Sequence, residues 1–316
     1  MDSIFQIGSF PFRLRCPKEV QPPENFMKFI CEESAGTWPE YTYEIRVADA
    51  LPMPEGKVLA RRPDLVVFRE ENGLEARLIG VKGRPDPYAC YRELSEERAQ
   101  TVLLAEEIRE LHIDPLFSSL LALERRLIRK DEMVLHCAYV EYKGEAILFS
   151  APSETGKTTQ ADLWAKHRGS RTVNGDRALL GKTGGRWTAQ GWPVCGTSEV
   201  CHNESIPIRA VVMLSQAKEN RAERMTPGQA FPLLYSQITV NKWNAEDHVH
   251  TLDLIDSFLR KCPCTIWGAP SRKRRWSAWP ERWRCRSGLE EELEKFQKLD
   301  RKKTGNSGCV LKGKGV

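Results

Sequence analysis

One short run of the 316-residue sequence combines the residue types that hold a polyphosphate. Its members are Ala151, Pro152, Ser153, Glu154, Thr155, Gly156, Lys157, Thr158 and Thr159. In a loop of this kind, successive backbone N–H groups curl around the phosphates, and a glycine lets the chain approach them closely. Lys157 is suited to reach the outer phosphates, and the Thr158 hydroxyl is a ligand for Mg²⁺. The run therefore predicts a site for a nucleoside triphosphate such as ATP, bound with Mg²⁺.

The segments that flank this run have the composition that such a loop needs. Residues 146–150 are a short apolar run of the length of a buried strand, and residues 159–165 have helix-forming composition with apolar spacing. The order strand, loop, helix places the positive end of a helix at the bound anion. We therefore predict a nucleotide site formed by Ser153, Glu154, Thr155, Gly156, Lys157, Thr158 and Thr159.

Two residues of the run depart from the usual phosphate-loop pattern. The first position is Ala151, where glycine is usual, and an inner position is Glu154, which brings a carboxylate beside a polyphosphate. Glu154 can point outward or repel the nucleotide. The alternative to a phosphate loop is an ordinary turn before a helix.

A carboxylate is expected at the end of the next strand. Residues 171–176 form a strand-like segment that ends at Asp176. A helix of about eleven residues and a return strand would bring Asp176 to the sheet edge that carries Lys157 and Thr158. There Asp176 can hold Mg²⁺ together with Thr158, or take a proton from an incoming hydroxyl. The alternative is a turn aspartate that follows an Asn-Gly pair.

The rest of the chain divides into three predicted regions. Residues 1–130 show short β-like segments broken by prolines, followed by two helix-like stretches at 96–111 and 115–130. Residues 131–268 hold the predicted phosphate loop and the strands and helices around it, and residues 269–316 are a basic tail rich in tryptophan. We predict an α/β protein with a mixed sheet, in which a smaller β-rich N-terminal module precedes a P-loop core.

Turn and capping residues predict further elements. Asn-Gly at 72–73 and Gly-Gly at 184–185 indicate hairpins. Thr226, followed by proline, predicts a helix that runs to about residue 240. Asn244 predicts a second helix start, and that helix runs to about residue 260.

The composition is that of a globular cytoplasmic protein, with 41% hydrophobic and 29% charged residues. No apolar run reaches the length of about 18 residues that spans a membrane, and the N-terminus lacks the basic-then-apolar pattern of a secretion signal. The ten cysteines are scattered without a Cys-x-x-Cys pair, which is typical of reduced thiols. We therefore expect no membrane partner.

The formal charge of +5 originates in the C-terminal region. Residues 266–316 carry a balance of +8, so the preceding 265 residues carry −3. Residues 266–287 hold four of the nine tryptophans and seven Lys or Arg with one acid, a mixture that can stack on single-stranded nucleic acid. Because the segment lacks helical and strand periodicity, we favour disorder or a non-native terminus over a nucleic-acid patch or an ordered core.

Residues from about 133 to 264 resemble the bacterial HPr kinase/phosphorylase and phosphoenolpyruvate carboxykinase-like group of P-loop proteins. The points of likeness are the hairpin that carries His136, the loop that ends at Thr159, and Asp176, nineteen residues after Lys157. In that family a histidine on the strand before the loop lies near the phosphate site, which the resemblance implies for His136. The alternative is a histidine satisfied within the core.

The resemblance implies an ATP-dependent kinase that phosphorylates a serine or threonine hydroxyl of a protein or peptide, with Lys157, Asp176 and His136 as catalytic residues. It also allows a homo-oligomer, and a role beside peptide-modification genes, as in kinases of lasso peptide precursors. HPr kinases carry two adjacent acids where this chain has Gly175 and Asp176. The alternative is a nucleotide-binding regulatory protein with weak catalysis.

Overall fold

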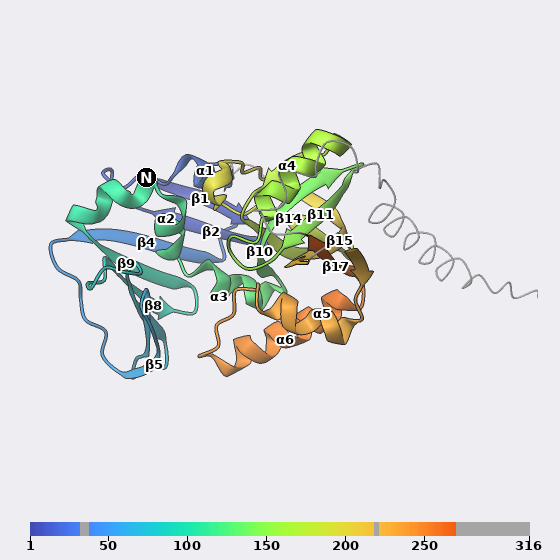
Figure 1. The fold of residues 1–316 in the computed structure, drawn as a ribbon. Coiled ribbons are helices and arrows are strands. Elements are labelled where there is room, and N and C mark those ends of the chain that lie inside the picture. The colour runs from blue at the N-terminus through green and yellow to red at the C-terminus, as the bar shows by residue number, and fades with distance from the viewer. Residues whose placement is uncertain (32–37, 218–220, 270–316) are drawn as a thin grey trace, which may run out of the picture.

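The computed structural model describes residues 1–31, 38–217 and 221–269. Within them the chain forms two β-sheets, of nine and eight strands, with helices between and around the sheets (Figure 1). The fold is therefore sheet-rich and mixed α/β, as predicted. The predicted disorder or non-native origin was assigned to residues 269–316, of which 270–316 lie outside the described residues.

The first sheet is built from the N-terminal third of the chain. Its strands are β1 (Asp2–Ile7), β2 (Phe10–Arg15), β3 (Ile30–Cys31), β4 (Tyr41–Ala48), β5 (Lys57–Arg62), β6 (Leu65–Arg69), β7 (Glu75–Ile79), β8 (Ala89–Ser95) and β9 (Arg98–Leu104). Their order is β3-β1-β2-β4-β9-β8-β7-β6-β5, with β4 parallel to β2 and β9. This sheet corresponds to the β-rich N-terminal module that the sequence predicts.

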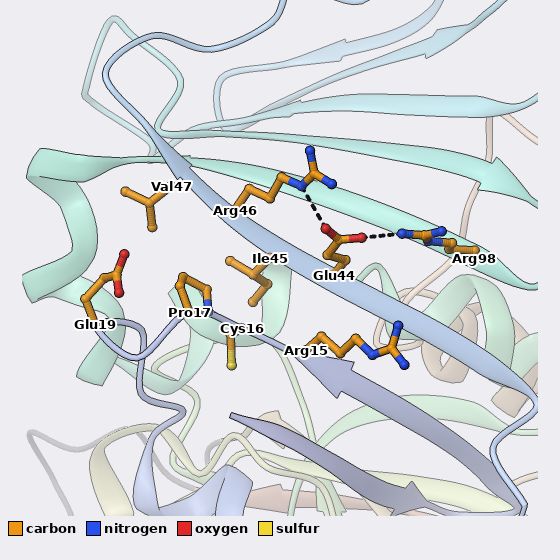
Figure 2. A pocket seen from close by; sticks show the side chains of 9 residues that line it. All are labelled: Arg15, Cys16, Pro17, Glu19, Glu44, Ile45, Arg46, Val47 and Arg98. Atoms are coloured by element: carbon orange, nitrogen blue, oxygen red, sulfur yellow. Dashed lines mark hydrogen bonds and ion pairs between the residues drawn. The ribbon is translucent and has the colours of Figure 1, made fainter.

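The side chains of β4 point alternately to the two faces of this sheet, one of which is buried and the other charged. Tyr41, Tyr43 and Ile45 are buried in an aromatic core that also covers the short helix α1 (Glu24–Met27). On the other face, Glu44 accepts a hydrogen bond from Arg46 at 2.7 Å and pairs with Arg98 of the neighbouring strand (Figure 2). The hydrogen bonds from Arg46 and Arg98 hold the pKa of Glu44 below its usual range. This face is therefore stabilised by charge pairs between strands.

The segment between the sheets differs from the two predicted helices. Residues 98–104 form β9, whose burial alternates along the strand, and only the 3₁₀ helix η2 (Ala105–His112) follows. The second stretch is divided into α2 (Asp114–Ser119), α3 (Leu123–Leu127) and η3 (Ile128–Lys130). Ala122 interrupts it because its φ of 46° lies in the left-handed region, which a right-handed helix cannot continue through.

The second sheet contains the predicted phosphate loop. Its strands are β10 (Met133–Tyr142), β11 (Glu145–Ser150), β12 (Arg171–Asn174), β13 (Arg177–Thr183), β14 (Arg186–Gln190), β15 (Ser205–Gln216), β16 (Arg221–Arg224) and β17 (Cys264–Ala269). Strands β11, β10, β13, β14 and β15 close into a ring because β11 also pairs with β15. Residues 266–269, which lack strand periodicity in the sequence, belong to β17 because they pair with β15 and β16.

Helices cover both faces of the second sheet (Figure 1). Ala138 and Val140 of β10 pack with α4 (Lys157–Arg168), whereas Leu135 and Tyr139 face the cluster that includes α5 (Pro227–Tyr235) and α6 (Ala245–Leu259). Asn244 caps α6 as predicted, through hydrogen bonds from two backbone N–H groups of its first turn. Helix α5 ends about five residues before the predicted position because residues 237–239 run along β10 instead.

None of the helices in residues 1–31, 38–217 and 221–269 combines the length and the apolar character needed to cross a membrane.

Glu132 joins the two sheets immediately before β10. Its side chain is buried, with the residue 3% exposed, and accepts hydrogen bonds from the backbone N–H of Ser9 at 3.0 and 3.2 Å. Gln190 of β14 donates to the same carboxyl group at 3.5 Å. Burial raises the pKa of Glu132 to about 7, although these hydrogen bonds oppose the rise. The junction of the sheets therefore contains a carboxyl group that titrates near neutral pH.

Replacing Glu132 with glutamine is expected to flatten the pH dependence of stability. Between about pH 4.5 and 7 the native state keeps a proton that the unfolded state has released, so wild-type stability falls as the pH rises. The total loss is on the order of 3 kcal/mol and is complete above pH 7. The amide of Glu132→Gln does not titrate, and urea denaturation across this range measures the difference. The exposed Glu55→Gln change is the control, and equal pH slopes for wild type and Glu132→Gln would contradict the expectation.

Candidate active site

Strand β10 pairs with β13 and β12 along one edge and with β11 along the other. His136 is opposite Arg177 of β13, and Cys137 is opposite Ser150, the last residue of β11. The backbone N–H of Cys137 donates to the Asp176 carbonyl oxygen at 2.9 Å, and the Ser150 hydroxyl donates to the His136 carbonyl oxygen at 2.8 Å. The three predicted elements, the histidine, the loop and the aspartate, therefore lie around the same part of β10.

The loop after β11 turns through two residues with positive φ. Glu154 has a φ of 64° and Gly156 a φ of 103°, and the second value is one that only glycine adopts readily. Gly156 then precedes α4, and no side chain among the described residues caps the helix start. The first N–H groups of a helix lack partners within the helix. They are therefore available to an anion at the loop.

Lys157 is the first residue of α4 and is buried, at 7% exposure. Its ammonium donates to the carbonyl oxygens of Ala151 at 3.0 Å and Pro152 at 3.4 Å. Burial lowers the pKa of Lys157, while the negative charge of Asp176 opposes that change. An ammonium has three donors, so two loop contacts leave one for another acceptor.

The remaining loop residues differ in exposure. Ser153 and Glu154 are exposed, whereas Thr155, Thr158 and Thr159 are half-buried. The exposure of Glu154 agrees with the first of the two possibilities given above, that its side chain points outward. The Thr158 hydroxyl is therefore the loop oxygen that follows Lys157 and can serve as a metal ligand.

Asp176 lies between a histidine and an arginine. Its Oδ1 is 3.4 Å from His136 Nε2, and its Oδ2 accepts a hydrogen bond from Arg177 Nε at 3.2 Å. Burial opposes ionisation of Asp176, but the His136 hydrogen bond and the charges of Arg177 and Lys157 together hold its pKa below the usual range. The site thus contains an ionised carboxylate that interacts with the loop lysine.

His136 is not enclosed in an apolar core. Its side chain is 21% exposed, and its Nδ1 lies 3.3 Å from Gln237 Oε1 while Nε2 faces Asp176. Both ring nitrogens therefore have oxygen partners at the site. The structure places His136, Asp176 and Lys157 together, and Arg177 and Gln237 join them without having been identified from the sequence.

Asn174 fixes the direction of Asp176. Fully buried, it accepts hydrogen bonds from the backbone N–H groups of Asp176 and Arg177 at 2.9 Å each. Its amide donates to the carbonyl oxygens of Trp192 at 3.0 Å and Val194 at 3.1 Å. An asparagine two residues before a functional aspartate is the pattern of an Asx turn, which is the signal that identifies this position.

The loop after β14 leaves no room for a second acid. A Cβ at Gly175 would lie 2.1 Å from Ser198 Oγ, and a Cβ at Gly196 would lie 3.1 Å from the Cβ of Asp176. Ser198 is held by its hydrogen bond to the Cys195 carbonyl oxygen at 2.7 Å. The single acid at this site is therefore a consequence of how the loop packs over it.

Within the described ranges, no group of three or more His, Cys, Asp or Glu side chains could hold a metal ion. The two residues predicted to hold Mg²⁺, Asp176 and Thr158, offer a carboxylate and a hydroxyl oxygen. Mg²⁺ usually binds proteins through one or two carboxylates and takes its other ligands from water and phosphates. The donor types at the loop therefore fit this ion.

This chain shows limited similarity to known proteins. The model of a family described as "SynChlorMet cassette protein ScmC" matches residues 102–255, a span that includes all of the predicted site residues. A search of curated proteins gives no match. Among solved structures, the HPr(Ser) kinase/phosphatase from Coxiella burnetii is 8% identical with a TM-score of 0.33, over 55% of this chain and 98% of that one.

Removing the Asn174 side chain is expected to destabilise the protein. Asn174→Ala removes four hydrogen bonds of a fully buried side chain, at a cost of about 3 kcal/mol or more in the free energy of unfolding. Urea denaturation measures this loss. The control is Asn203→Ala, whose exposed side chain donates one hydrogen bond to the Lys28 carbonyl oxygen and should cost below about 1 kcal/mol. Similar losses in both variants would show that Asn174 does not organise the site.

Proposed function

We propose that this protein is an ATP-dependent phosphotransferase that transfers a phosphoryl group to a serine or threonine hydroxyl of a protein or peptide. The proposal is carried by one observation. A loop with positive-φ residues leads into a helix start without a side-chain cap, and the lysine of that helix start interacts electrostatically with the ionised Asp176. Anion-binding amides, a cation and a metal-binding carboxylate are the components that phosphoryl transfer requires.

The loop would bind the triphosphate. The free N–H groups at the start of α4 donate to phosphate oxygens, and Lys157 exchanges its contacts with the Ala151 and Pro152 carbonyl oxygens for the outer phosphates. Thr158 and Asp176 would hold Mg²⁺. When bound, this ion supplies positive charge that offsets the charge of the phosphates. Arg177, beside Asp176, adds a second protein cation to the same region.

Asp176 and His136 have different chemical roles in this proposal. Asp176 orients the acceptor hydroxyl and takes its proton, which is the role of the catalytic aspartate in protein kinases. Both ring nitrogens of His136 face side-chain oxygens, so no ring lone pair is free to accept that proton. We therefore assign to His136 the positioning of Asp176, through the hydrogen bond that its Nε2 donates to the carboxylate.

A nucleotide-binding regulatory protein is the second candidate. It is favoured by Glu154 in the loop and by the single acid that the packing of Gly175 against Ser198 imposes. Both candidates require nucleotide binding, and only the first requires transfer to an acceptor. Measurements of binding and of transfer therefore separate them.

Lys157→Ala is expected to abolish stabilisation by Mg-ATP. A ligand present at about 100 times its Kd stabilises the folded state by about 2.7 kcal/mol, which raises the thermal midpoint of the wild type. The matched control is Lys166→Ala, an exposed lysine in the last turn of the same helix, which should keep the full shift. An unchanged shift in Lys157→Ala would remove the proposed nucleotide site.

His136→Ala is expected to separate transfer from binding. Loss of the hydrogen bond that positions Asp176 should lower single-turnover transfer from ATP to a serine peptide by up to about 100-fold, because a small misplacement of a catalytic group costs that much. Stabilisation by Mg-ATP should persist, and the exposed His202→Ala change should affect neither measurement. Binding without any transfer in the wild type would favour the regulatory candidate.

A further inference from the structure

A cleft of about 590 Å³ lies next to Asp176, between the first and second sheets. Arg62 from the end of β5 and Ser118 from α2 line one side. Asp176, Arg177 and most of the α5–α6 connection, residues 235–243, line the other. Its volume falls within the range of ligand pockets. Asp176 therefore belongs both to this cleft and to the candidate active site.

The α5–α6 connection forms a fixed wall that begins at the candidate active site. The backbone N–H of His136 donates to the Gln237 carbonyl oxygen at 2.9 Å, and that of Thr239 donates to the Val134 carbonyl oxygen at 2.9 Å. Arg177 Nη1 donates to Thr239 Oγ1 at 3.3 Å. The α5–α6 connection is therefore hydrogen-bonded to β10 and leads away from the candidate active site.

Trp243 anchors the other end of this wall to the first sheet. Its Nε1 donates to Glu75 Oε2 at 2.9 Å, and the guanidinium groups of Arg77 and Arg62 lie 5.4 and 5.9 Å from its ring centre. Cation–π contacts of this kind are favourable within about 6 Å. Because both ends are attached, the cleft is formed before any ligand arrives, which reduces the ordering cost of binding.

The charges that line the cleft leave one cation without a carboxylate. Arg62 pairs with Asp64, Arg77 with Glu124, and Arg177 with Asp176. Lys242 is exposed, and its ammonium lies 5.0 Å from the ring of Tyr235. No ion pair joins Lys242 to a carboxylate among the residues that the structure describes. A negative group in the cleft would therefore meet an attractive charge at Lys242.

We propose that this cleft receives an extended peptide segment of the phosphoryl acceptor, with an acidic side chain near Lys242. The inference rests on the proposed function, because an acceptor hydroxyl must come within hydrogen-bond distance of Asp176. The residues that flank the hydroxyl then have to lie in the cleft that Asp176 lines. Lys242 selects acidic over basic flanking residues by charge.

The test measures binding of two labelled synthetic peptides, which share one serine and differ only in carrying glutamate or lysine at the flanking positions. Fluorescence anisotropy at low ionic strength gives their Kd values for the wild type and two variants. The glutamate peptide should bind the wild type about fivefold more tightly than the lysine peptide. Lys242→Glu should invert this preference.

Lys182→Glu is the matched control. The Lys182 ammonium also lies over an aromatic ring, 4.8 Å from that of Trp187, but on β13 and outside the cleft lining. This variant should keep the wild-type preference. The thermal midpoint of each variant reports whether it is folded, and charge reversal at one exposed lysine is expected to leave it near the wild-type value.

Binding of neither peptide, or one preference shared by all three proteins, would overturn the inference. Stabilisation by Mg-ATP, measured separately, tests the proposed function. If Mg-ATP stabilises the protein but the preference does not depend on Lys242, the cleft inference fails alone. If the preference inverts but Mg-ATP has no effect, the peptide site stands and the phosphotransferase proposal fails.

Discussion

The two edges of β10 determine where the candidate site residues lie. Along one edge the strand pairs with β13 up to His136 and with β12 from Tyr139, and along the other it pairs with β11 from Cys137. Each edge brings one segment to the middle of β10, because β13 follows Asp176 and β11 precedes the loop. The hydrogen bond from the Cys137 N–H to the Asp176 carbonyl oxygen holds the backbone of the aspartate on this strand. Loop and carboxylate therefore approach each other from opposite edges of β10.

The fold also couples the electrostatics of these groups. The charge of Asp176 helps to keep Lys157 protonated despite burial, and Lys157 in turn helps to keep Asp176 ionised. Arg177 and His136 add to the stabilisation of the carboxylate. A bound polyphosphate would add negative charge beside the lysine and arginine, and a metal ion would offset the same charge beside the aspartate. Without any ligand, the site therefore already contains the cations that would bind a polyphosphate and the carboxylate that would bind a metal ion.

Local patterns predicted much of the second sheet. The strand, loop and helix around Lys157 were recognisable because each depends on neighbours in sequence, and the cap at Asn244 acts within one turn of its helix. The prediction of one helix over 96–111 was wrong, because residues 98–104 form β9. The alternation of β9 is stabilised by pairing with β4 and β8, from distant parts of the sequence. The left-handed backbone conformation of Ala122 likewise could not be predicted from the apolar periodicity of residues 115–130.

The parts of the site that the sequence did not reveal all depend on long-range contacts. Asn174 acts through the carbonyl groups of Trp192 and Val194, and Gln237 reaches His136 from the end of α5. The cleft requires the first sheet, the α5–α6 connection and β13 at once, and no local pattern brings these three together.

The single acid at the site has a physical reason of the same long-range kind. Family resemblance suggests two adjacent acids, but any side chain at position 175 would overlap Ser198, which is fixed by its own hydrogen bond to Cys195. The close approach of Gly196 to Asp176 places this loop directly over the remaining acid. In the proposed reaction, one carboxylate would then have to hold the metal and orient the acceptor hydroxyl. The neighbouring His136 donates to that carboxylate through Nε2 and so holds it in the position that both tasks require.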